Sequence, residues 1–252
     1  MNISSYIDYT LLHPSATERD IIELCLTAQK NDYYAVNING YYVSLAKQLL
    51  DKTNIKISTS IGFPLGAMTT DSKVYEAKKA INDGADEIEM VINVGLLKSK
   101  NYVSVLKDIS DVKLAIGDTP LKVVIEISEL SKNEVIRICE ICLDANVEYI
   151  KTSSGFSKNG ATLSTVKIIK KTMKDNMKII AFDGIEDSKT ALKYLESGAD
   201  RVGICYGIDL IGKTRSIRNS KIFKQYIKTV QKDDVLIIDG ITENNFNDKI
   251  KL

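Results

Sequence analysis

The sequence has few of the residues that mark several common protein classes. Its 252 residues include one histidine, His13, and no cluster of metal ligands, which argues against a tightly bound zinc ion. We expect neither a metal nor another cofactor. Only 3 prolines are present, and no stretch rich in serine, glycine and proline forms a linker, so one large domain is favoured.

Neither an excess of charge nor a long hydrophobic run is present. Lysine plus arginine (34) nearly balances aspartate plus glutamate (33), and the net charge is +1. This balance gives no support for a nucleic-acid or membrane partner, which usually requires a concentrated basic face. No apolar run reaches the ~18 residues that span a bilayer, and the N-terminus lacks a signal-peptide pattern. We therefore expect a cytoplasmic protein.

The 4 cysteines are expected to be reduced thiols, as is usual in the cytoplasm. Cys139 and Cys142 form a C-x-x-C pair, which in other settings binds metal or exchanges disulfides. The apolar spacing of the surrounding NEVIRICEICLDA is helical. That spacing favours two core positions of a helix over a redox or metal motif.

Short β-branched runs alternate with amphipathic segments along most of the chain. Strands separated by helices predict parallel pairing, and eight such units in about 250 residues match a (β/α)8 TIM barrel. We predict a single-domain α/β barrel over residues 1–231 and a C-terminal extension of unknown role over 232–252. An open doubly wound sheet is the alternative, but no G-x-G-x-x-G follows the first strand. The predicted strands are 6–10, 33–38, 55–61, 86–93, 121–127, 147–152, 177–182 and 200–205.

Alternate residues of a barrel strand point inward, and the chemistry of such barrels lies at the C-terminal ends of the strands. In DEIEMVIN (86–93) the isoleucines and methionine form an outer face, which leaves Glu89 inward. The same rule turns Lys151 inward at the end of its strand, and it places Asp8 with Thr10 on one face. Asn37 lies on the corresponding face of the second strand. One amine and several polar groups therefore converge.

An inward lysine has two interpretations. Burial lowers the pKa of an amine, and a neutral amine can attack a carbonyl group to form a Schiff base. Alternatively, Lys151 forms a buried ion pair with Glu89 or Glu126 that has only a structural role. The period of two does not separate these interpretations.

Six segments, taken together in this order and spacing, are specific. They are IDYTLLHPSAT (7–17), IGFPLGAMTTDSK (61–73), GADEIEMVINVGLLK (84–98), LKVVIEISELS (121–131), KTSSGFSKNGAT (151–162) and GADRVG (198–203). They resemble the deoxyribose-phosphate aldolase family, class I aldolases built on a (β/α)8 barrel. The resemblance implies that Lys151 forms the Schiff base, that Glu89 is the acid/base group and that Asp8 shares its role. It implies no cofactor and a small aldehyde or ketone as the substrate.

The chain departs from the family pattern around this lysine. Ile180 stands where the family has a second lysine, whose charge would help to lower the pKa of Lys151. Asp183 and Glu186 occupy the turn that the resemblance assigns to phosphate binding, where their charge would repel a phosphate. The alternative for these two acids is that they only begin a helix. The implied substrate-binding residues are Thr10, Asn37, Thr152, Gly155, Ile180, Asp183, Gly184, Gly203 and Cys205.

The sequence therefore predicts an aldolase-type carbon–carbon lyase that acts on a non-phosphorylated carbonyl compound through Lys151. Two alternatives are an inactive aldolase-like binding protein and a residual 2-deoxyribose-5-phosphate aldolase. Phe182 and Tyr206 are expected either to narrow the mouth of the barrel or to pack in its core. The expected oligomeric state is a homodimer.

Overall fold

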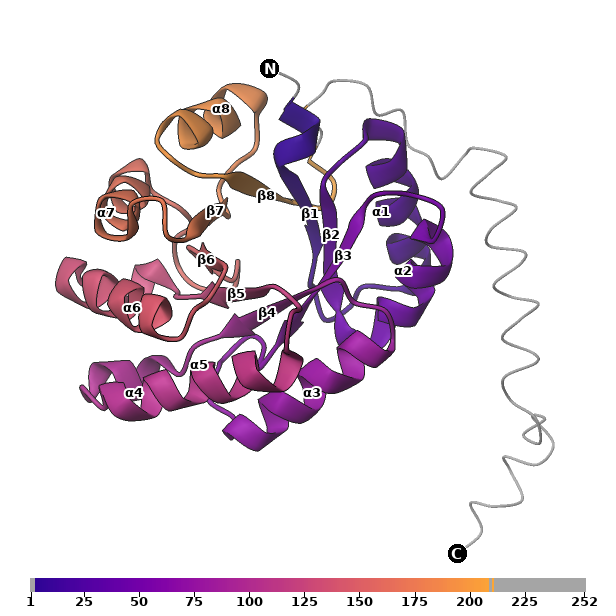
Figure 1. Ribbon diagram of the computed structural model, residues 1–252. Coiled ribbons are helices and arrows are strands. Elements are labelled where there is room, and N and C mark those ends of the chain that lie inside the picture. The colour runs from indigo at the N-terminus through magenta and orange to yellow at the C-terminus, as the bar shows by residue number, and fades with distance from the viewer. Residues whose placement is uncertain (1–2, 209, 211–252) are drawn as a thin grey trace, which may run out of the picture. The chain divides into compact units, whose positions relative to one another are not determined.

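Eight parallel strands close into a barrel in the computed structural model, which describes residues 3–208 and residue 210 (Figure 1). The strands follow one another in chain order and β8 pairs with β1, so the predicted TIM barrel is confirmed. The predicted boundary at 231 and the extension 232–252 lie outside the described residues. The strands are β1 (Ile7–Leu11), β2 (Ala35–Asn39), β3 (Lys56–Ile61), β4 (Glu87–Val91), β5 (Leu121–Val124), β6 (Tyr149–Lys151), β7 (Lys178–Phe182) and β8 (Arg201–Cys205).

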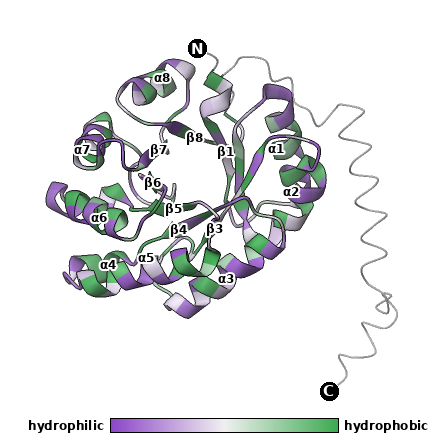
Figure 2. Cartoon of the chain, in the orientation of Figure 1, coloured by the Kyte–Doolittle hydropathy of each residue, from purple (hydrophilic) through white to green (hydrophobic). Residues whose placement is uncertain are grey.

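Helices surround the strands and carry both hydrophobic and hydrophilic residues (Figures 1 and 2). None of the described helices is long and apolar enough to cross a membrane. Short 3-10 helices occupy Ile3–Tyr6, Gly40–Tyr42 and Ile127–Glu129. The α-helices are α1 (Glu18–Asn31), α2 (Val43–Leu50), α3 (Thr70–Asn82), α4 (Val94–Lys98), α5 (Tyr102–Ile116), α6 (Lys132–Asp144), α7 (Leu163–Met173) and α8 (Ser188–Glu196).

The helix termini follow local sequence signals. Thr17 caps α1, and its backbone N–H donates to the Asp20 carboxylate at 2.9 Å, which completes a capping box. In α6 the buried residues include Cys139 and Cys142, so the predicted helix-core pair is confirmed. All 4 cysteines of the chain are free thiols.

The two faces of the strands have opposite character. Ile88 and Met90 of β4 are fully buried on the outer face, toward the helices. The alternate positions, Glu87 and Glu89, contact lysines of β5 and β6 across the barrel interior. The predicted inward orientation of Glu89 and Lys151 is thus confirmed, and the barrel centre holds ion pairs where many TIM barrels hold branched apolar side chains.

The loop after β3 packs closely on the end of β4. Gly66 donates its backbone N–H to Gly62 O at 2.7 Å and has a φ of 65°. A Cβ atom on Gly66 would lie 2.0 Å from the carbonyl oxygen of Ile92, a backbone atom that cannot turn aside. Only glycine allows this approach next to the strand that carries Glu89.

We predict that Gly66→Ala destabilises the protein far more than Gly117→Ala. Both glycines have a positive φ, 65° and 58°, so both variants carry a backbone cost, and at Gly117, where ψ is −123°, that cost is the whole of the effect. No atom lies within 4 Å of the Cβ position at Gly117, whereas Gly66→Ala adds the clash with Ile92. Urea denaturation measures the difference, and equal losses of unfolding free energy would contradict it.

Candidate active site

Lys151 and Glu89 form a buried ion pair inside the barrel. The Lys151 Nζ lies 2.9 Å from Oε1 and 2.8 Å from Oε2 of Glu89, and both side chains are fully buried. Lys151 is the last residue of β6, while Glu89 lies at the centre of β4. The amine is therefore at the C-terminal end of its strand, where (β/α)8 enzymes carry their chemistry.

The pKa of Lys151 lies below the ordinary value for lysine. Burial is the main cause, because removal from water disfavours the ammonium form. The Glu89 carboxylate opposes the shift by favouring the ammonium, and the charge of Lys122 reinforces it. Lys122 thus acts on Lys151 in the direction that the family's second lysine would act.

Further side chains hold Glu89 in place. Asn37 of β2 donates its Nδ2 to Oε2 of Glu89 at 3.1 Å, and Ser60 of β3 donates its hydroxyl to Oε1 at 2.9 Å. The Asn37 carbonyl oxygen is buried and has no hydrogen-bond partner within the described part of the chain. An acceptor for a hydroxyl group or a water molecule is thus present beside the ion pair.

A second charged layer lies nearer the N-terminal ends of the strands. Lys122 of β5 places its Nζ 2.6 Å from Glu87 and 3.1 Å from Asp8. Arg201 of β8 approaches the same two carboxylates at 3.2 and 3.4 Å. Glu87 precedes Glu89 by two positions on β4, so this layer supports the Lys151–Glu89 pair from below.

Asp8 belongs to this lower layer. Burial alone would raise the pKa of Asp8, but the charges of Arg201 and Lys122 outweigh burial and lower the pKa. The described contacts of its carboxylate are with those two cations. Its predicted share in proton transfer stays a prediction, since these contacts do not place it beside the amine.

Strand β7 brings Ile180 and Phe182 to the amine. Ile180 is fully buried and is the register partner of Lys151, at the position predicted to replace a second lysine. Phe182 lies two residues further along the same face, and its ring centroid is 4.0 Å from the Lys151 Nζ. The amine therefore has an aliphatic neighbour and an aromatic face on this side.

Glu126 holds the loop after β6 and does not pair with Lys151. Glu126, at a φ of 55°, accepts hydrogen bonds from the hydroxyl groups of Ser154 and, at 2.6 Å, Ser157. The alternative in which Glu126 pairs with Lys151 is wrong, because the carboxylate is engaged by this loop. Thr152 of the loop also accepts from Phe182 N at 3.0 Å and donates to Phe182 O at 3.1 Å.

The turn after β7 keeps a backbone shape typical of two glycines although one is an aspartate. Asp183 and Gly184 have φ values of 75° and 76°, and Asp183 accepts a hydrogen bond from Gly184 N at 3.0 Å. Asp187 caps α8, so neither Asp183 nor Glu186 is the capping residue, although Glu186 directly precedes the cap. Burial, and then Asp183 and Glu186, raise the pKa of Cys205.

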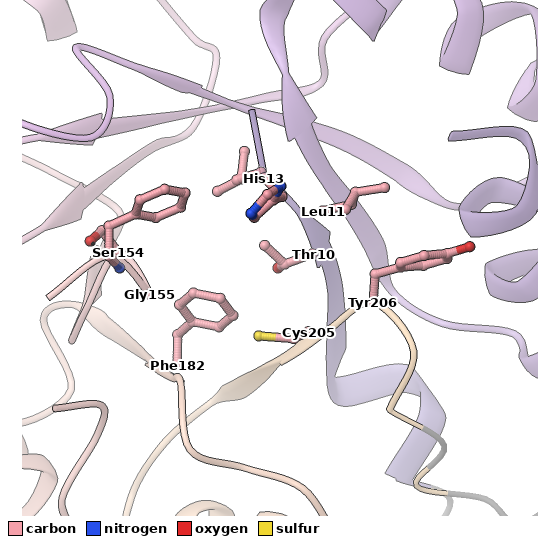
Figure 3. Close-up of a pocket in the computed structure, with 10 residues that line it drawn as sticks. Thr10, Leu11, His13, Ser154, Gly155, Phe182, Cys205 and Tyr206 are labelled. Carbon is pink, nitrogen blue, oxygen red and sulfur yellow. Dashed lines mark hydrogen bonds between the residues drawn. The ribbon is translucent and has the colours of Figure 1, made fainter. Parts of the chain in front are cut away.

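A pocket of about 390 Å³ is lined by residues at or after the C-terminal ends of β1, β6, β7 and β8 (Figure 3). Of the predicted substrate-binding residues it contains Thr10, Gly155 and Cys205, and Phe182 and Tyr206 line it as expected. Lys151 and Glu89 are not among its lining residues. The full lining is Thr10, Leu11, Leu12, His13, Ser154, Gly155, Phe156, Phe182, Cys205 and Tyr206.

Three interior residues, Ser60, Lys122 and Arg201, are not among those expected from the sequence. A signal was present for the two cations, since each lies next to a buried apolar residue in a predicted strand and the period of two would turn it inward. The position of His13 at the pocket had no such signal, because the residue follows the end of β1.

Known proteins agree with this architecture. A model of the DeoC/LacD family aldolases matches residues 3–252. Deoxyribose-phosphate aldolase 1 of Mesoplasma florum is 45% identical over 211 residues, which cover 84% of this chain and 96% of the relative.

Solved structures extend the comparison. The structure of QR15, an aldolase, is 34% identical with a TM-score of 0.80 and covers 94% of this chain and 99% of its own. The tetrameric deoxyribose phosphate aldolase of Aeropyrum pernix is 28% identical, with a TM-score of 0.74 and coverage of 80% and 86%.

A closed parallel barrel with a buried lysine–carboxylate pair near the C-terminal ends of its strands has the architecture of a barrel aldolase. The sequence match specifies which one. The chain belongs to the DeoC/LacD family of aldolases and is a carbon–carbon lyase. Family membership favours an enzyme over the alternative of an inactive binding protein.

We predict that Lys122→Met destabilises the fold by roughly 3–5 kcal/mol, because it leaves Asp8 and Glu87 buried with one cation fewer. Lys47→Met is the control: Lys47 lies 3.9 Å from Asp51 at the surface, where an ion pair contributes at most about 1 kcal/mol. Urea denaturation of both variants tests this, and a loss for Lys122→Met no greater than the control's would contradict it.

Proposed function

We propose that this aldolase works through a Schiff base on Lys151, with Glu89 as the acid/base group. The observation that carries the proposal is the contact between the two side chains, with Nζ within 2.9 Å of both carboxylate oxygens in full burial. The ion pair with Glu89 that the second interpretation expected is compatible with the catalytic role of Lys151 in the first. The ion pair orders the resting site, and the lowered pKa of Lys151 makes the neutral amine accessible.

The proposed reaction starts with a proton transfer from the ammonium group to Glu89. The neutral Nζ then attacks the carbonyl carbon of the donor, and Glu89 returns the proton to the oxygen. A second proton passes from the nitrogen to this hydroxyl group through Glu89, and the oxygen leaves as water when the iminium forms. The Glu89 carboxylate next removes a proton from the carbon beside the iminium to give an enamine. This carbon attacks the acceptor aldehyde while Glu89 gives its proton to the oxygen that becomes the new hydroxyl group. Addition of water to the resulting iminium then releases the product and restores the amine.

Neighbouring side chains assist these steps. Asn37 and Ser60 hold the Glu89 carboxylate, and the unpaired carbonyl oxygen of Asn37 is an acceptor for the departing or attacking water. Lys122 replaces the family's second lysine as the cation that depresses the pKa of Lys151, from the layer below. Asp8 then contributes by holding Lys122 at 3.1 Å.

The acceptor is proposed to carry no phosphate. Asp183 and Glu186 stand in and next to the turn after β7, and each close negative charge would weaken phosphate binding by about 1 kcal/mol or more. The second candidate is 2-deoxyribose 5-phosphate, which is favoured by the name deoxyribose-phosphate aldolase of the 45% identical relative. The retained left-handed backbone at Asp183 and Gly184 is compatible with either acceptor.

The proposal also covers the cellular location and the oligomeric state. Four free thiols are typical of a reducing compartment, which supports a cytoplasmic location. A homodimer is proposed as the assembly, and the relative from Aeropyrum pernix is a tetramer. Sedimentation of the purified chain distinguishes these assemblies.

We predict that acetaldehyde and borohydride together give a stable mass adduct at Lys151, because the reductant traps the iminium. The rate of trapping should rise with pH toward a midpoint below 10.5, the ordinary pKa of lysine, since only the neutral amine reacts. Peptide mass spectrometry locates the adduct. Lys151→Ala should give none at this site and Lys47→Ala should behave as the wild type; a wild-type chain without an adduct from any carbonyl compound would refute the mechanism.

We predict that Asp183→Gly raises kcat/KM for 2-deoxyribose 5-phosphate about fivefold to tenfold and changes kcat/KM for 2-deoxyribose less than about twofold. The reason is the loss of one negative charge near the phosphate. Asp32→Gly is a matched control, because Asp32 also has a positive φ, 55°, at the end of α1. A wild-type chain that prefers the phosphorylated sugar by about 1,000-fold or more would instead establish the second candidate.

A further inference from the structure

The aromatic ring of Phe182 lies directly on the amine that the proposed function requires. Its centroid is 4.0 Å from the Lys151 Nζ, and the lysine side chain is fully buried. Phe182 itself is 2% exposed. In this position the ring occupies space that a carbonyl compound would need in order to reach Nζ.

The Phe182 ring occupies space that is free because two neighbouring residues are glycines. A Cβ atom on Gly203 of β8 would lie 2.5 Å from Cδ2 of Phe182, and one on Gly155 would lie 3.0 Å from Cε1. Thr152 fixes the backbone of Phe182 through hydrogen bonds in both directions. The ring position is thus specified from three separate segments, β6 with its following loop, β7 and β8.

The opposite side of the ring lines the pocket. In Figure 3 the Phe182 ring faces the same space as Thr10 and Cys205, with Gly155 beside it. Within the described part of the chain, the pocket wall includes Phe182 but neither Lys151 nor Glu89. Phe182 therefore separates the pocket from the reacting groups.

We propose that Phe182 is the specificity-determining residue of this aldolase: it closes the passage from the pocket to Lys151 and selects for small aldehydes as donors. The inference rests on the proposed function, because it concerns access to the same amine. A two-carbon aldehyde needs only a small rotation of the ring toward the pocket. A longer aldehyde requires the ring and the alkyl chain to occupy the same space.

The ring has a second effect once the donor has reacted. Condensation of the amine with the aldehyde forms a C=N bond and releases one water molecule, and it leaves a positive charge on nitrogen. The Phe182 face stabilises that cation as it does the ammonium.

The experiment compares two aldehydes in competition, acetaldehyde and 3-phenylpropanal, trapped with borohydride and quantified on the Lys151 peptide. We expect the wild type to favour acetaldehyde by about 100-fold, in line with the selectivity of tight apolar pockets. Phe182→Ala should reduce that preference below about tenfold by accelerating the reaction of the larger aldehyde. Phe182→Leu, which keeps an apolar side chain of intermediate size, should lie between the two.

Tyr75→Ala is the control variant, because Tyr75 is an aromatic residue on α3 that is 74% exposed. It should retain the wild-type preference. A Phe182→Ala or Phe182→Leu chain that is folded by circular dichroism and keeps the wild-type preference would overturn the inference. Absence of any Lys151 adduct, with both aldehydes and in every variant, would overturn the proposed function itself and the inference with it.

Discussion

The buried ion pair between Lys151 and Glu89 is the interaction on which the site depends. A lysine and a glutamate without water between them are stable only when each charge has a partner and the remaining polar atoms are hydrogen-bonded. Asn37 and Ser60 meet the second requirement for Glu89. The same burial that makes the pair necessary also depresses the pKa of the amine, so the structural constraint and the reactivity have one cause.

The lower layer extends this constraint through the barrel. Lys122 and Arg201 face Asp8 and Glu87, and their charges balance within the layer. Because Lys122 is close enough to influence Lys151, this balance also tunes the amine above it. This chain, with Ile180 in place of a second lysine, thus has a cation that acts on Lys151 and is held by the carboxylates of the lower layer.

The surroundings of the pair have changed more than the pair itself. Phe182 covers the amine, and Asp183 brings negative charge to a turn whose backbone still has the shape of a glycine pair. Both changes lie on β7 or directly after it, next to Ile180. Ile180, Phe182 and Asp183 thus gather at one strand end, whereas the proposed nucleophile and acid/base group lie on β6 and β4.

The sequence by itself determined the barrel, the inward orientation of Glu89 and Lys151, and the helical setting of Cys139 and Cys142. These features follow from periodicity along one strand or helix, which is local and can be seen in the residues. Only the tertiary structure decided that Glu126 holds a loop, and that Phe182 lies on the amine. Such partnerships join strands far apart in the chain, and they depend on the register and distances that barrel closure sets.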